Sequence, residues 1–479
     1  MTKGRHVCAL FAVLIVICLA ARQGAADGPE RPNVVIIFTD DQGYGDVGVY
    51  GARGFETPHL DQMAAEGVRF TEFYAASPVC TPSRAALLTG SYPIRVGLPN
   101  VLGPGSDIGM SADELTLAEM LKAEGYATAI YGKWHLGHHP EFLPTRHGFD
   151  EFHGIPYSND MWPYHPTADH FPDLPLFEGE EVVNAAVQAD DQKQFTKEFT
   201  ERAVAFIEAH RDEPFFVYLA HPMPHVPLYV SEAFEGVSEL GLYGDVIMEI
   251  DWSVGQILET LRDLELDEQT LVLFASDNGP WLVYGDHAGS SGPLREGKHT
   301  TWDGGTRVPF IAWYPGQIPA GAVCREPAMT IDLMPTIAGL TGGALPEHPI
   351  DGKDIWPLLR GDDEARTPQE AYFFYHGQGN RVLQAVRSGH WKLHFPHGYH
   401  TVVEPGTDGQ PGEATQGETP LALFDLKNDL AQQTNLASVY PAVVERLEAL
   451  ADEARVELGD ARLDMEGAGV RPPGRIDGE

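Results

Sequence analysis

Continuous apolar runs alternate with helical patterns over the first three quarters of the chain. Residues 34–38, 215–219 and 270–275 are apolar runs rich in β-branched and aromatic side chains, and such runs are typical of strands buried on both faces of a parallel sheet. Apolar residues recur at helical spacing over 195–210 and 246–264, which predicts helices between those strands. The alternation predicts an α/β fold with a large helix-flanked, mostly parallel central sheet.

Local start signals place further elements. Ser111 and Glu114 have the spacing of a capping box and predict a helix that runs through Leu121. A strand is expected to follow over residues 126–131. In an α/β sheet the functional residues collect where strands end, so the residues just after each apolar run are the candidates for chemistry.

The pattern changes near residue 360. A polar stretch over 361–368 predicts a linker, and short strands, a loop rich in Gly, Pro, Thr and Glu, and one long helix are expected after it. The expected strands are residues 371–375, 382–387 and 391–395, the loop is 405–419, the helix is 440–458, and the last ten residues are expected to fray. We therefore expect a catalytic α/β domain over residues 27–362 and a smaller C-terminal α+β domain over residues 363–479, with a short antiparallel sheet and a terminal helix.

The first 26 residues have the layout of a secretory signal peptide. Lys3 and Arg5 precede an apolar run over 7–21, and small residues at 24–26 offer a cleavage site. The run is short for the ~20 apolar residues that a bilayer span needs, so a cleaved signal is favoured over an uncleaved N-terminal anchor. We expect residues 1–26 to be removed, and the mature chain to be exported, periplasmic or extracellular, and not membrane-spanning.

Composition limits the class of ligand. The 479 residues include 70 Asp and Glu against 32 Lys and Arg, which gives a net charge of −38. A hydrophobic content of 43% supports a large core, so wholesale disorder is excluded, and the acid excess argues against nucleic acid as a partner. An anionic substrate would need a local group of cationic side chains that works against the field of the whole protein.

Two pairs of oxygen-bearing side chains follow buried runs. Asp40 and Asp41 come just after the first run, and Asp277 and Asn278 come after the run that ends near residue 275. The chain turns at a strand end, so both members of a pair can face one ion. Three carboxylates and an amide are hard oxygen ligands, which suit Ca²⁺ or Mg²⁺ rather than zinc. A turn or a helix cap is the alternative for either pair taken alone.

Cys80 lies just ahead of a helix that is expected to begin at Pro82. The positive end of that helix and its free N–H groups favour an anionic nucleophile or a bound anion, and Arg84 adds a cation in the first turn. A buried structural thiol is the alternative. Of the other cysteines, Cys8 and Cys18 leave with the signal, and Cys324 is either a partner of Cys80 in a disulfide or a free thiol without an assigned role.

The segment that starts at Cys80 meets the pattern Cys-x-Pro-Ser-Arg-x-x-x-Leu-Thr-Gly in full. This pattern resembles the signature of the type I sulfatases, enzymes of the alkaline-phosphatase-like superfamily, and the resemblance implies that superfamily's fold. Further segments resemble the family in order and rough spacing over nearly the whole mature chain. They are residues 39–46, 132–137, 221–225, 276–279, 297–298, 304–309, 423–426 and 435–437.

The resemblance implies a modified residue and a metal. In the family the signature cysteine, here Cys80, is oxidised after translation to formylglycine by a formylglycine-generating maturation enzyme, and the hydrated gem-diol is the nucleophile. One Ca²⁺ ion would be held by this residue and by the two strand-end pairs. The implied metal ligands are Asp40, Asp41, Cys80, Asp277 and Asn278.

The resemblance also implies roles for basic side chains. Arg84 would brace the gem-diol, and Lys133, His225 and Lys298 would hold the sulfate oxygens. His135 would hydrogen-bond the gem-diol and take its proton when sulfate is expelled. Either His225 or Lys298 would protonate the leaving oxygen. A metal together with Lys and Arg side chains is what stabilisation of charge on a transferring sulfuryl group requires.

Together these inferences predict a secreted sulfatase, a sulfuric ester hydrolase that cleaves a sulfate monoester of a small molecule or a glycan to an alcohol and inorganic sulfate. A carbohydrate sulfate is favoured over an aryl sulfate. Aromatic and polar residues are mixed in two loops, 153–170 and 280–299, that are expected over the site, and they suit stacking on a sugar or an aryl ring. His376, Arg381 or His397 would add to the rim. The alternatives are a phosphate or phosphonate ester hydrolase of the same superfamily, and a catalytically silent binder of sulfated glycans in which the signature cysteine is not oxidised.

Overall fold

The structure, a computed structural model, describes residues 31–476. The expected signal peptide over residues 1–26 lies outside this range. Within residues 31–476, no helix combines the length and the apolar character that crossing a membrane requires.

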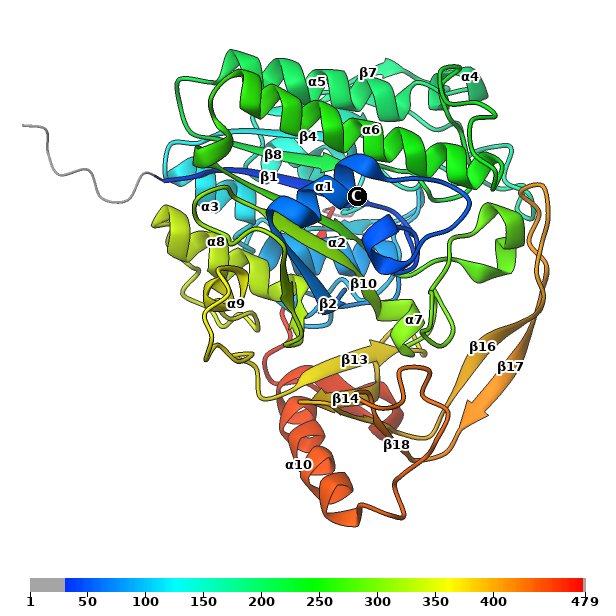
Figure 1. Cartoon of the computed structure of the whole chain (residues 1–479). Coiled ribbons are helices and arrows are strands. Elements are labelled where there is room, and N and C mark those ends of the chain that lie inside the picture. Colours follow the sequence, from blue (N-terminus) through cyan, green and yellow to red (C-terminus); the bar gives the residue numbers. More distant parts are fainter. Residues whose placement is uncertain (1–30, 477–479) are drawn as a thin grey trace, which may run out of the picture. The chain divides into compact units, whose positions relative to one another are not determined.

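A mixed sheet of eleven strands lies at the centre of this region (Figure 1). Its order is β11 (Ala322–Cys324), β2 (Val68–Tyr74), β10 (Arg307–Trp313), β9 (Thr270–Ser276), β1 (Asn33–Thr39), β8 (Phe215–Ala220), β4 (Ala127–Lys133), β5 (Glu151–Ile155), β6 (Leu176–Glu178) and β7 (Glu181–Asn184), with β12 (Ala328–Met329) beside β2. The inner strands from β9 to β5 are parallel, whereas β10, β6 and β7 make antiparallel pairs. The prediction of a mostly parallel central sheet is confirmed.

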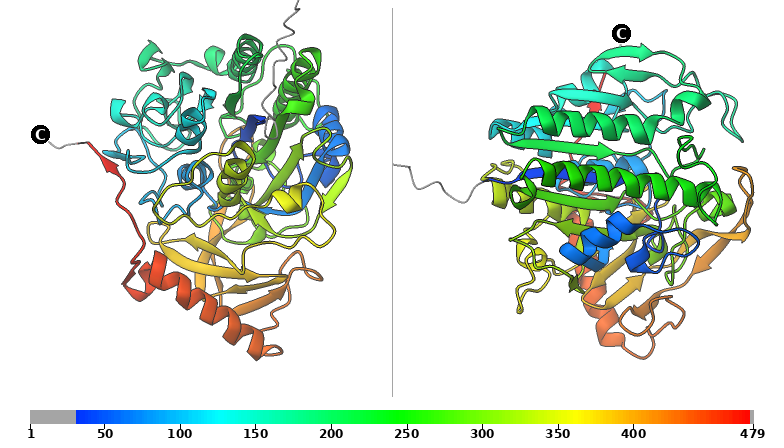
Figure 2. Two further views of the ribbon diagram at one scale, coloured as in Figure 1. Left: turned by 90° about the vertical axis from the view of Figure 1, so that its left-hand side faces the viewer. Right: turned by 45° about the horizontal axis from the view of Figure 1, so that its top comes forward.

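Helices cover both faces of the sheet, as Figure 2 shows. One face carries α1 (Pro58–Glu66), α5 (Phe195–Ala209) and α6 (Leu242–Asp263), and the other carries α2 (Cys80–Thr89), α3 (Leu117–Ala123) and α8 (Leu333–Thr341). Successive side chains of β1 alternate between them, because Val35 and Ile37 pack in the first group and Val34 and Ile36 in the second. Every residue of β1 is therefore buried, which explains the uninterrupted apolar run over residues 34–38.

Short elements connect these layers. They are η1 (Gly48–Tyr50), β3 (Ile108–Gly109), η2 (Pro140–Phe142), η3 (Pro144–Arg146), α4 (Ala189–Gln192), η4 (Asp267–Gln269), η5 (Leu282–His287), α7 (Asp303–Thr306), η6 (Thr330–Asp332) and α9 (Trp356–Leu359).

The C-terminal quarter forms a second, antiparallel sheet. Its order is β13 (Tyr372–His376), β14 (Val382–Ser388), β15 (Trp391–His394) and β18 (Ala422–Asp425), with α10 (Pro441–Leu458) packed against it and η7 (Ala461–Leu463), β19 (Gly459–Asp460) and β20 (Met465–Glu466) following. Lys392 Nζ of β15 lies 2.8 Å from Asp303 Oδ1 of α7, and both side chains are fully buried. The antiparallel sheet and the terminal helix that the sequence predicts are confirmed.

The prediction of a loop over residues 405–419 is wrong for its second half. β16 (His397–Glu404) and β17 (Glu413–Thr419) form a long hairpin that extends from the C-terminal sheet (Figure 1). The N–H groups of Gly406 and Gly412 near its tip both donate to the carbonyl of Val283 in η5. Most side chains of the hairpin are at least partly exposed, so its sequence lacks the apolar alternation by which a strand is recognised.

The capping box of α3 also differs from the prediction. The helix begins at Leu117, and its capping residues are Thr116 and Glu119 rather than Ser111 and Glu114. Both pairs have the required spacing, and tertiary packing selects the second.

The described residues near the C-terminus are held where fraying was expected, and residues 477–479 of that stretch lie outside the described range. Arg471 donates two hydrogen bonds, of 2.6 and 2.8 Å, to the carboxylate of Glu114. β21 (Gly474–Arg475) then pairs with β3. Partners more than 350 positions apart leave no local pattern in the sequence.

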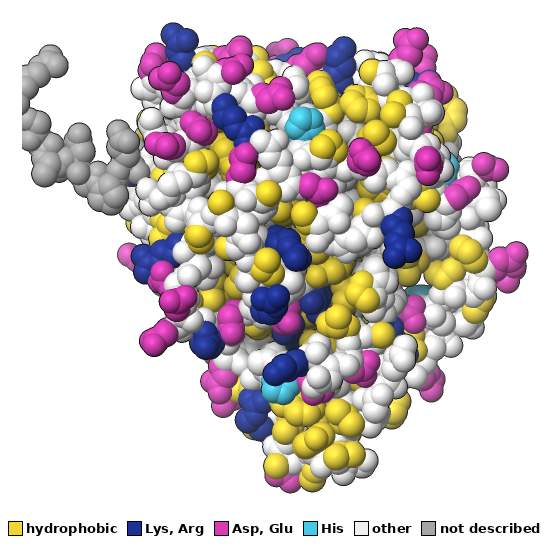
Figure 3. Space-filling model, in the orientation of Figure 1, with side chains coloured by type: hydrophobic (Ala, Val, Ile, Leu, Met, Phe, Trp, Pro, Cys, Tyr) yellow, Lys and Arg dark blue, Asp and Glu magenta, His cyan; other side chains and the backbone are white. Residues whose placement is uncertain are grey.

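Charged side chains of both signs lie on the molecular surface. On the face in Figure 3, acidic side chains are interspersed with lysine and arginine. The excess of acidic residues is thus compatible with a solvated surface, whereas the charges of greatest chemical interest are buried.

Candidate active site

Two strand ends bring the oxygen-bearing side chains together. β1 and β9 are parallel neighbours in which Thr39 lies opposite Ser276, so the residues that follow meet at one edge of the sheet. The N–H of Asp41 donates to Asp277 Oδ1 at 3.1 Å, and Asn278 Nδ2 donates to Asp41 Oδ1 at 2.6 Å. The four side chains at positions 40, 41, 277 and 278 are all buried.

Cys80 is the first residue of α2, which starts two residues before the predicted Pro82. Its Sγ lies 3.5 Å from Asp40 Oδ1 and 3.4 Å from Lys298 Nζ, and the residue is 2% exposed. Cys324 is a free thiol, as is Cys80, so no disulfide joins them. The start of α2 thus sets Cys80 beside the strand-end carboxylates.

Arg84 contacts the same carboxylates from the next turn of α2. Its Nη2 lies 3.1 Å from Asp40 Oδ2 and 2.9 Å from Asp277 Oδ2. Its Nη1 donates to the carbonyl of Lys133 at 2.9 Å. The planar guanidinium therefore fixes the ends of three strands relative to one another.

Lys133 and His135 lie at the end of β4. Lys133 Nζ donates to Asp40 Oδ2 and, at 3.1 Å, to Ser158 Oγ. His135 Nε2 lies 2.8 Å from the carbonyl oxygen of Leu102, while its Nδ1 has no hydrogen-bond partner in residues 31–476. A carbonyl can only accept, so Nε2 carries the proton and Nδ1 is left as an acceptor.

Lys298 and His225 complete the cluster from two loops. Lys298 Nζ lies 2.7 Å from Asp41 Oδ1 and 4.7 Å from the ring centroid of Trp281. His225 Nε2 lies 3.6 Å from Asp41 Oδ2, and its Nδ1 donates to the carbonyl of Val226 at 2.6 Å. The metal-ligand candidates and the basic side chains that the sequence singles out therefore lie together in one buried cluster at the strand ends.

Neighbouring charges keep part of this cluster ionised. Burial would raise the pKa of Asp40, but Lys133 and the other nearby cations outweigh burial and hold that pKa far below its usual range. Burial would lower the pKa of Lys298, but Asp41 and the other acidic groups around it together outweigh burial and raise that pKa. The pKa of Lys133 is raised for the same reason, chiefly by Asp40.

For Asp277 and Cys80, in contrast, the surroundings favour the neutral form of the side chain. Burial and the charge of Asp40 raise the pKa of Asp277 to about 7, and the same two causes raise the pKa of the Cys80 thiol. The thiol is therefore neutral near pH 7. Two carboxylates repel each other here, and a further positive charge would favour the ionised form of both.

The side chains fit a hard divalent cation. Asn278 Oδ1 is buried and has no hydrogen-bond partner in the described part of the chain, and such an acceptor costs about 1–3 kcal/mol unless it is satisfied. Ligand atoms of Asp40, Asp41, Cys80 and His225 lie within 4.8 Å of one another. Hard cations prefer oxygen to imidazole, so the strand-end oxygens are the better set of ligands.

A pocket of about 350 Å³ adjoins the cluster and has Lys298 in its wall. The residues that line it are Trp281, Leu282, Val283, Glu296, Gly297, Lys298, His299, His376, His400, Val402 and Ala414. Of the three residues expected at the rim, His376 lines the pocket, and Arg381 and His397 do not. The hairpin of β16 and β17 supplies one wall.

Sequence reasoning missed some contributors to the site. Ser158, the hydrogen-bond partner of the β4 lysine, lies in an expected specificity loop without a motif of its own. His400 lies in the hairpin whose strands are not apparent from the sequence. Arg295 belongs to an expected substrate loop, but it stacks 3.7 Å from the ring centroid of Trp302 and donates to Tyr399 Oη at 2.7 Å, so it fastens the hairpin.

Comparison with known proteins gives matches over nearly the whole described chain. Residues 32–344 match the family model described as sulfatase, residues 367–472 match the C-terminal region of aryl-sulfatase, and residues 297–401 match the C-terminal part of N-sulphoglucosamine sulphohydrolase. The chain is 42% identical to arylsulfatase A of Bos taurus, over 94% of this chain and 91% of the relative. It is 41% identical to N-acetylgalactosamine-6-sulfatase of Canis lupus familiaris, over 85% and 80% respectively.

A solved structure shows the same fold. The crystal structure of the PsFucS1 sulfatase from Pseudoalteromonas sp. matches with a TM-score of 0.80 and 28% identity, over 88% of this chain and 90% of that one. Sequence and fold thus agree with the buried cluster of acidic, cationic and cysteine side chains at the strand ends. The chain belongs to the sulfatase family and is an enzyme that hydrolyses sulfate esters.

Proposed function

We propose that this sulfatase removes sulfate from a carbohydrate, with a formylglycine made from Cys80 as nucleophile and one Ca²⁺ ion as cofactor. The observation that carries the proposal is the position of Cys80 Sγ, 3.4 Å from Lys298 Nζ and 3.5 Å from Asp40 Oδ1 in a buried cluster. In this proposal the enzyme acts after export, with residues 1–26 removed, 27–362 as its catalytic domain and 363–479 as its C-terminal domain.

The Cys80 thiol itself is a poor nucleophile. Burial and Asp40 raise its pKa, so little thiolate exists near neutral pH. A formylglycine at this position supplies a hydrated aldehyde, one of whose hydroxyls attacks sulfur while the other allows sulfate to be expelled. Because residue 80 is 2% exposed in the folded chain, we expect the maturation enzyme to act on the segment before it folds.

The strand-end oxygens would hold the metal. Asp40, Asp41, Asp277 and Asn278, together with residue 80, are the ligands in this proposal. A bound Ca²⁺ would supply positive charge beside the nucleophile and the sulfate oxygens. The chain contributes by fixing the ligands: the guanidinium of Arg84 holds the carboxylates of Asp40 and Asp277 at 3.1 and 2.9 Å.

The buried cations would bind the sulfate group. Lys133 and Lys298 are held in their charged forms by the adjacent carboxylates, so they present fixed positive charge to an anion. His225 contacts both Asp41 and Trp281, and the centroids of the His225 and Trp281 rings are 5.6 Å apart. This local positive charge would allow a protein with a net charge of −38 to bind an anion. Preorganised charges act over short distances in a site from which water is excluded.

Two histidines would move protons. Burial and neighbouring cations lower the pKa of His135 well below its usual range, so it is neutral, and its unpartnered Nδ1 can accept a proton. Burial and Lys298 also lower the pKa of His225, so its imidazolium would form when the anionic sulfate group binds beside it, and it would then release a proton more readily than a lysine whose pKa is raised. We therefore assign protonation of the leaving oxygen to His225 rather than Lys298.

A carbohydrate suits the adjoining pocket. Its volume of about 350 Å³ combines the aromatic face of Trp281 with the imidazoles of His299, His376 and His400. Burial lowers the pKa of His376 to about 4, so this ring is neutral and offers hydrogen bonds to hydroxyl groups. The relative named N-acetylgalactosamine-6-sulfatase supports a sugar as the group that bears the sulfate.

The first prediction concerns the nucleophile. Protein from the native host is expected to carry an aldehyde or its hydrate at residue 80, and Cys80→Ala and Cys80→Ser are expected to lose turnover of 4-nitrophenyl sulfate while unfolding at the wild-type temperature. Mass spectrometry of the peptide and a thermal melt measure both. An intact thiol in fully active protein would refute the assignment and favour another reaction centre.

The second prediction concerns the metal. Dialysis against a chelator is expected to remove activity, and Ca²⁺ should restore it. Elemental analysis should find one calcium per wild-type chain and much less in Asp277→Asn, because the amide lacks the charge that a hard cation requires. The matched control is Asp286→Asn, which makes the same change outside the cluster and should bind calcium as the wild type does. Full activity in protein free of divalent metal would contradict the proposal.

The third prediction separates the two candidate acids. His225→Ala is expected to lose about 10²–10⁴-fold in kcat on a sulfated sugar, whose leaving alkoxide needs a proton, and much less on 4-nitrophenyl sulfate, whose leaving group does not. Lys298→Ala should affect both substrates alike, because it removes sulfate binding. Equal losses for His225→Ala on the two substrates would assign it to binding alone.

The fourth prediction concerns the pocket. The double variant His376→Ala, His400→Ala is expected to lose about tenfold in kcat/KM on a sulfated sugar, since each lost hydrogen bond is worth about 0.5–1.5 kcal/mol. Its kcat/KM on 4-nitrophenyl sulfate should change little. The exposed His390, at the turn between β14 and β15, gives the control His390→Ala. Equal losses on both substrates would show that the pocket does not select the sugar.

A further inference from the structure

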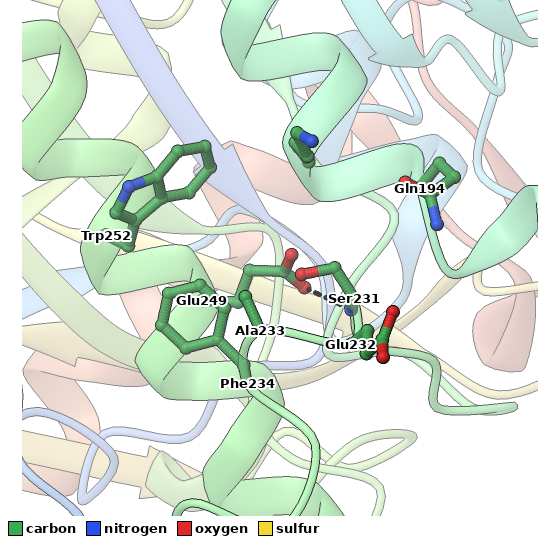
Figure 4. Close-up of a pocket in the computed structure, with 8 residues that line it drawn as sticks. Gln194, Ser231, Glu232, Ala233, Phe234, Glu249 and Trp252 are labelled. Atoms are coloured by element: carbon green, nitrogen blue, oxygen red, sulfur yellow. Dashed lines mark hydrogen bonds between the residues drawn. The ribbon is translucent and has the colours of Figure 1, made fainter.

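A second pocket, of about 560 Å³, is lined by none of the residues of the catalytic cluster. It lies between the start of α5, which contributes Gln194 and Lys197, and the first half of α6, which contributes Glu249 and Trp252. A loop with Phe234 forms the remaining wall. Figure 4 shows the side chains of α6 and of the loop on one side of the pocket and those of α5 on the other.

The pocket contains a buried carboxylate with an unused oxygen. Glu249 is 1% exposed. Its Oε2 accepts a hydrogen bond of 3.2 Å from the N–H of Ser231, as Figure 4 shows, whereas its Oε1 has no partner in residues 31–476. A buried acceptor without a partner is unfavourable, so a ligand that donates a hydrogen bond would stabilise this arrangement.

An aromatic surface adjoins that carboxylate. Trp252 lies one turn after Glu249 on α6, so the two side chains share a face of the helix. The rings of Trp252 and Phe234 have centroids 6.1 Å apart at an interplanar angle of 52°, and both residues are half-buried. An apolar ring face beside a hydrogen-bonding carboxylate suits a sugar ring, which offers C–H groups on its face and hydroxyl groups around its edge.

The charges around the pocket narrow the choice of ligand. Lys197 and Gln194 supply donors on the α5 side, and Glu232 adds a second carboxylate at the rim. Two carboxylates disfavour direct contact with phosphate or sulfate groups, so the pocket suits an unsulfated unit of a glycan rather than nucleic acid, and the buried carboxylate of Glu249 disfavours a lipid chain. A saccharide uses the acceptors, the donors and the ring surface together.

The connectivity places this pocket at the catalytic edge of the sheet. α5 leads into β8 and α6 leads into β9, and these strands are parallel to β1. A helix that leads into a parallel strand runs back along the sheet, so its first half lies toward the edge where the strands end. That edge carries Asp40 and Asp277. A glycan of several sugar units can therefore reach the pocket and the cluster along one side of the molecule.

We propose that this second pocket binds one sugar unit of a glycan at a distance from the sulfate that is removed. The proposal rests on the proposed function for the nature of the substrate, and it adds a second point of attachment for an extended chain. It predicts that long sulfated glycans bind more tightly than sulfated monosaccharides, since two linked contacts reinforce each other.

Three variants test the proposal. Trp252→Ala removes the ring surface, Glu249→Gln replaces the carboxylate by an amide of the same shape, and Ala233→Trp fills the pocket from its exposed rim. Native electrophoresis in gels that contain chondroitin sulfate or κ-carrageenan measures binding by the full chain. Each variant is expected to weaken retardation at least about fivefold in a polysaccharide that retards the wild type, and to keep wild-type kcat/KM on 4-nitrophenyl sulfate. Glu235→Gln, in the same loop but outside the pocket, is the matched control and should behave as wild type.

The outcomes distinguish this proposal from the proposed function. Unchanged retardation of Trp252→Ala and Ala233→Trp in both polysaccharides, or no retardation of the wild type in either, would overturn the second site. Because Trp252→Ala also removes packing from α6, Ala233→Trp is decisive if the first variant unfolds at a lower temperature. Failure of the proposed function would appear separately, as wild-type protein that releases no sulfate from any sulfated sugar.

Discussion

Buried charges of opposite sign at the ends of parallel strands are the interaction on which the rest of the site depends. Asp40, Asp41 and Asp277 are removed from water, and they lie among the equally buried Arg84, Lys133 and Lys298. Removing one member of a buried ion pair typically costs several kcal/mol because its partner is left uncompensated. Each charge therefore requires the others, and the geometry of the site is set as a unit by the register of β1 and β9.

Part of this unit follows patterns that the residues show by themselves, whereas Lys133 and Lys298 are identified only through the resemblance to the family. The strand over residues 33–39 is fully buried. The pairs Asp40–Asp41 and Asp277–Asn278 follow directly after strands β1 and β9, which end side by side. Helix α2 is recognisable from the signature segment, although its first turn includes Cys80 itself. Patterns of burial and motifs that lie within a few residues of one another thus determine most of the central sheet and the positions of the strand-end acids and of Arg84.

The remaining features depend on partners that are distant in the sequence. Strands β16 and β17 pair with each other on an exposed surface, so their composition resembles that of a loop. Glu114 has the spacing for a helix cap, yet it binds Arg471 near the other end of the chain. Arg295 lies in a loop that is expected to contact the substrate, but it stacks on Trp302 instead. In each case two local interpretations were physically acceptable, and long-range packing decided between them.

The hairpin attaches to η5 through its backbone rather than through its side chains. Gly406 and Gly412 donate to Val283, and a Cβ at Gly285 would lie 1.9 Å from the carbonyl oxygen of Gly406, so the approach of the two chains requires glycine. Attachment by the backbone leaves the side chains at positions 400, 402 and 414 free to vary where they face the pocket. Substrate preference can then diverge during evolution by substitution in the hairpin, while the buried charges that carry out the chemistry stay unchanged.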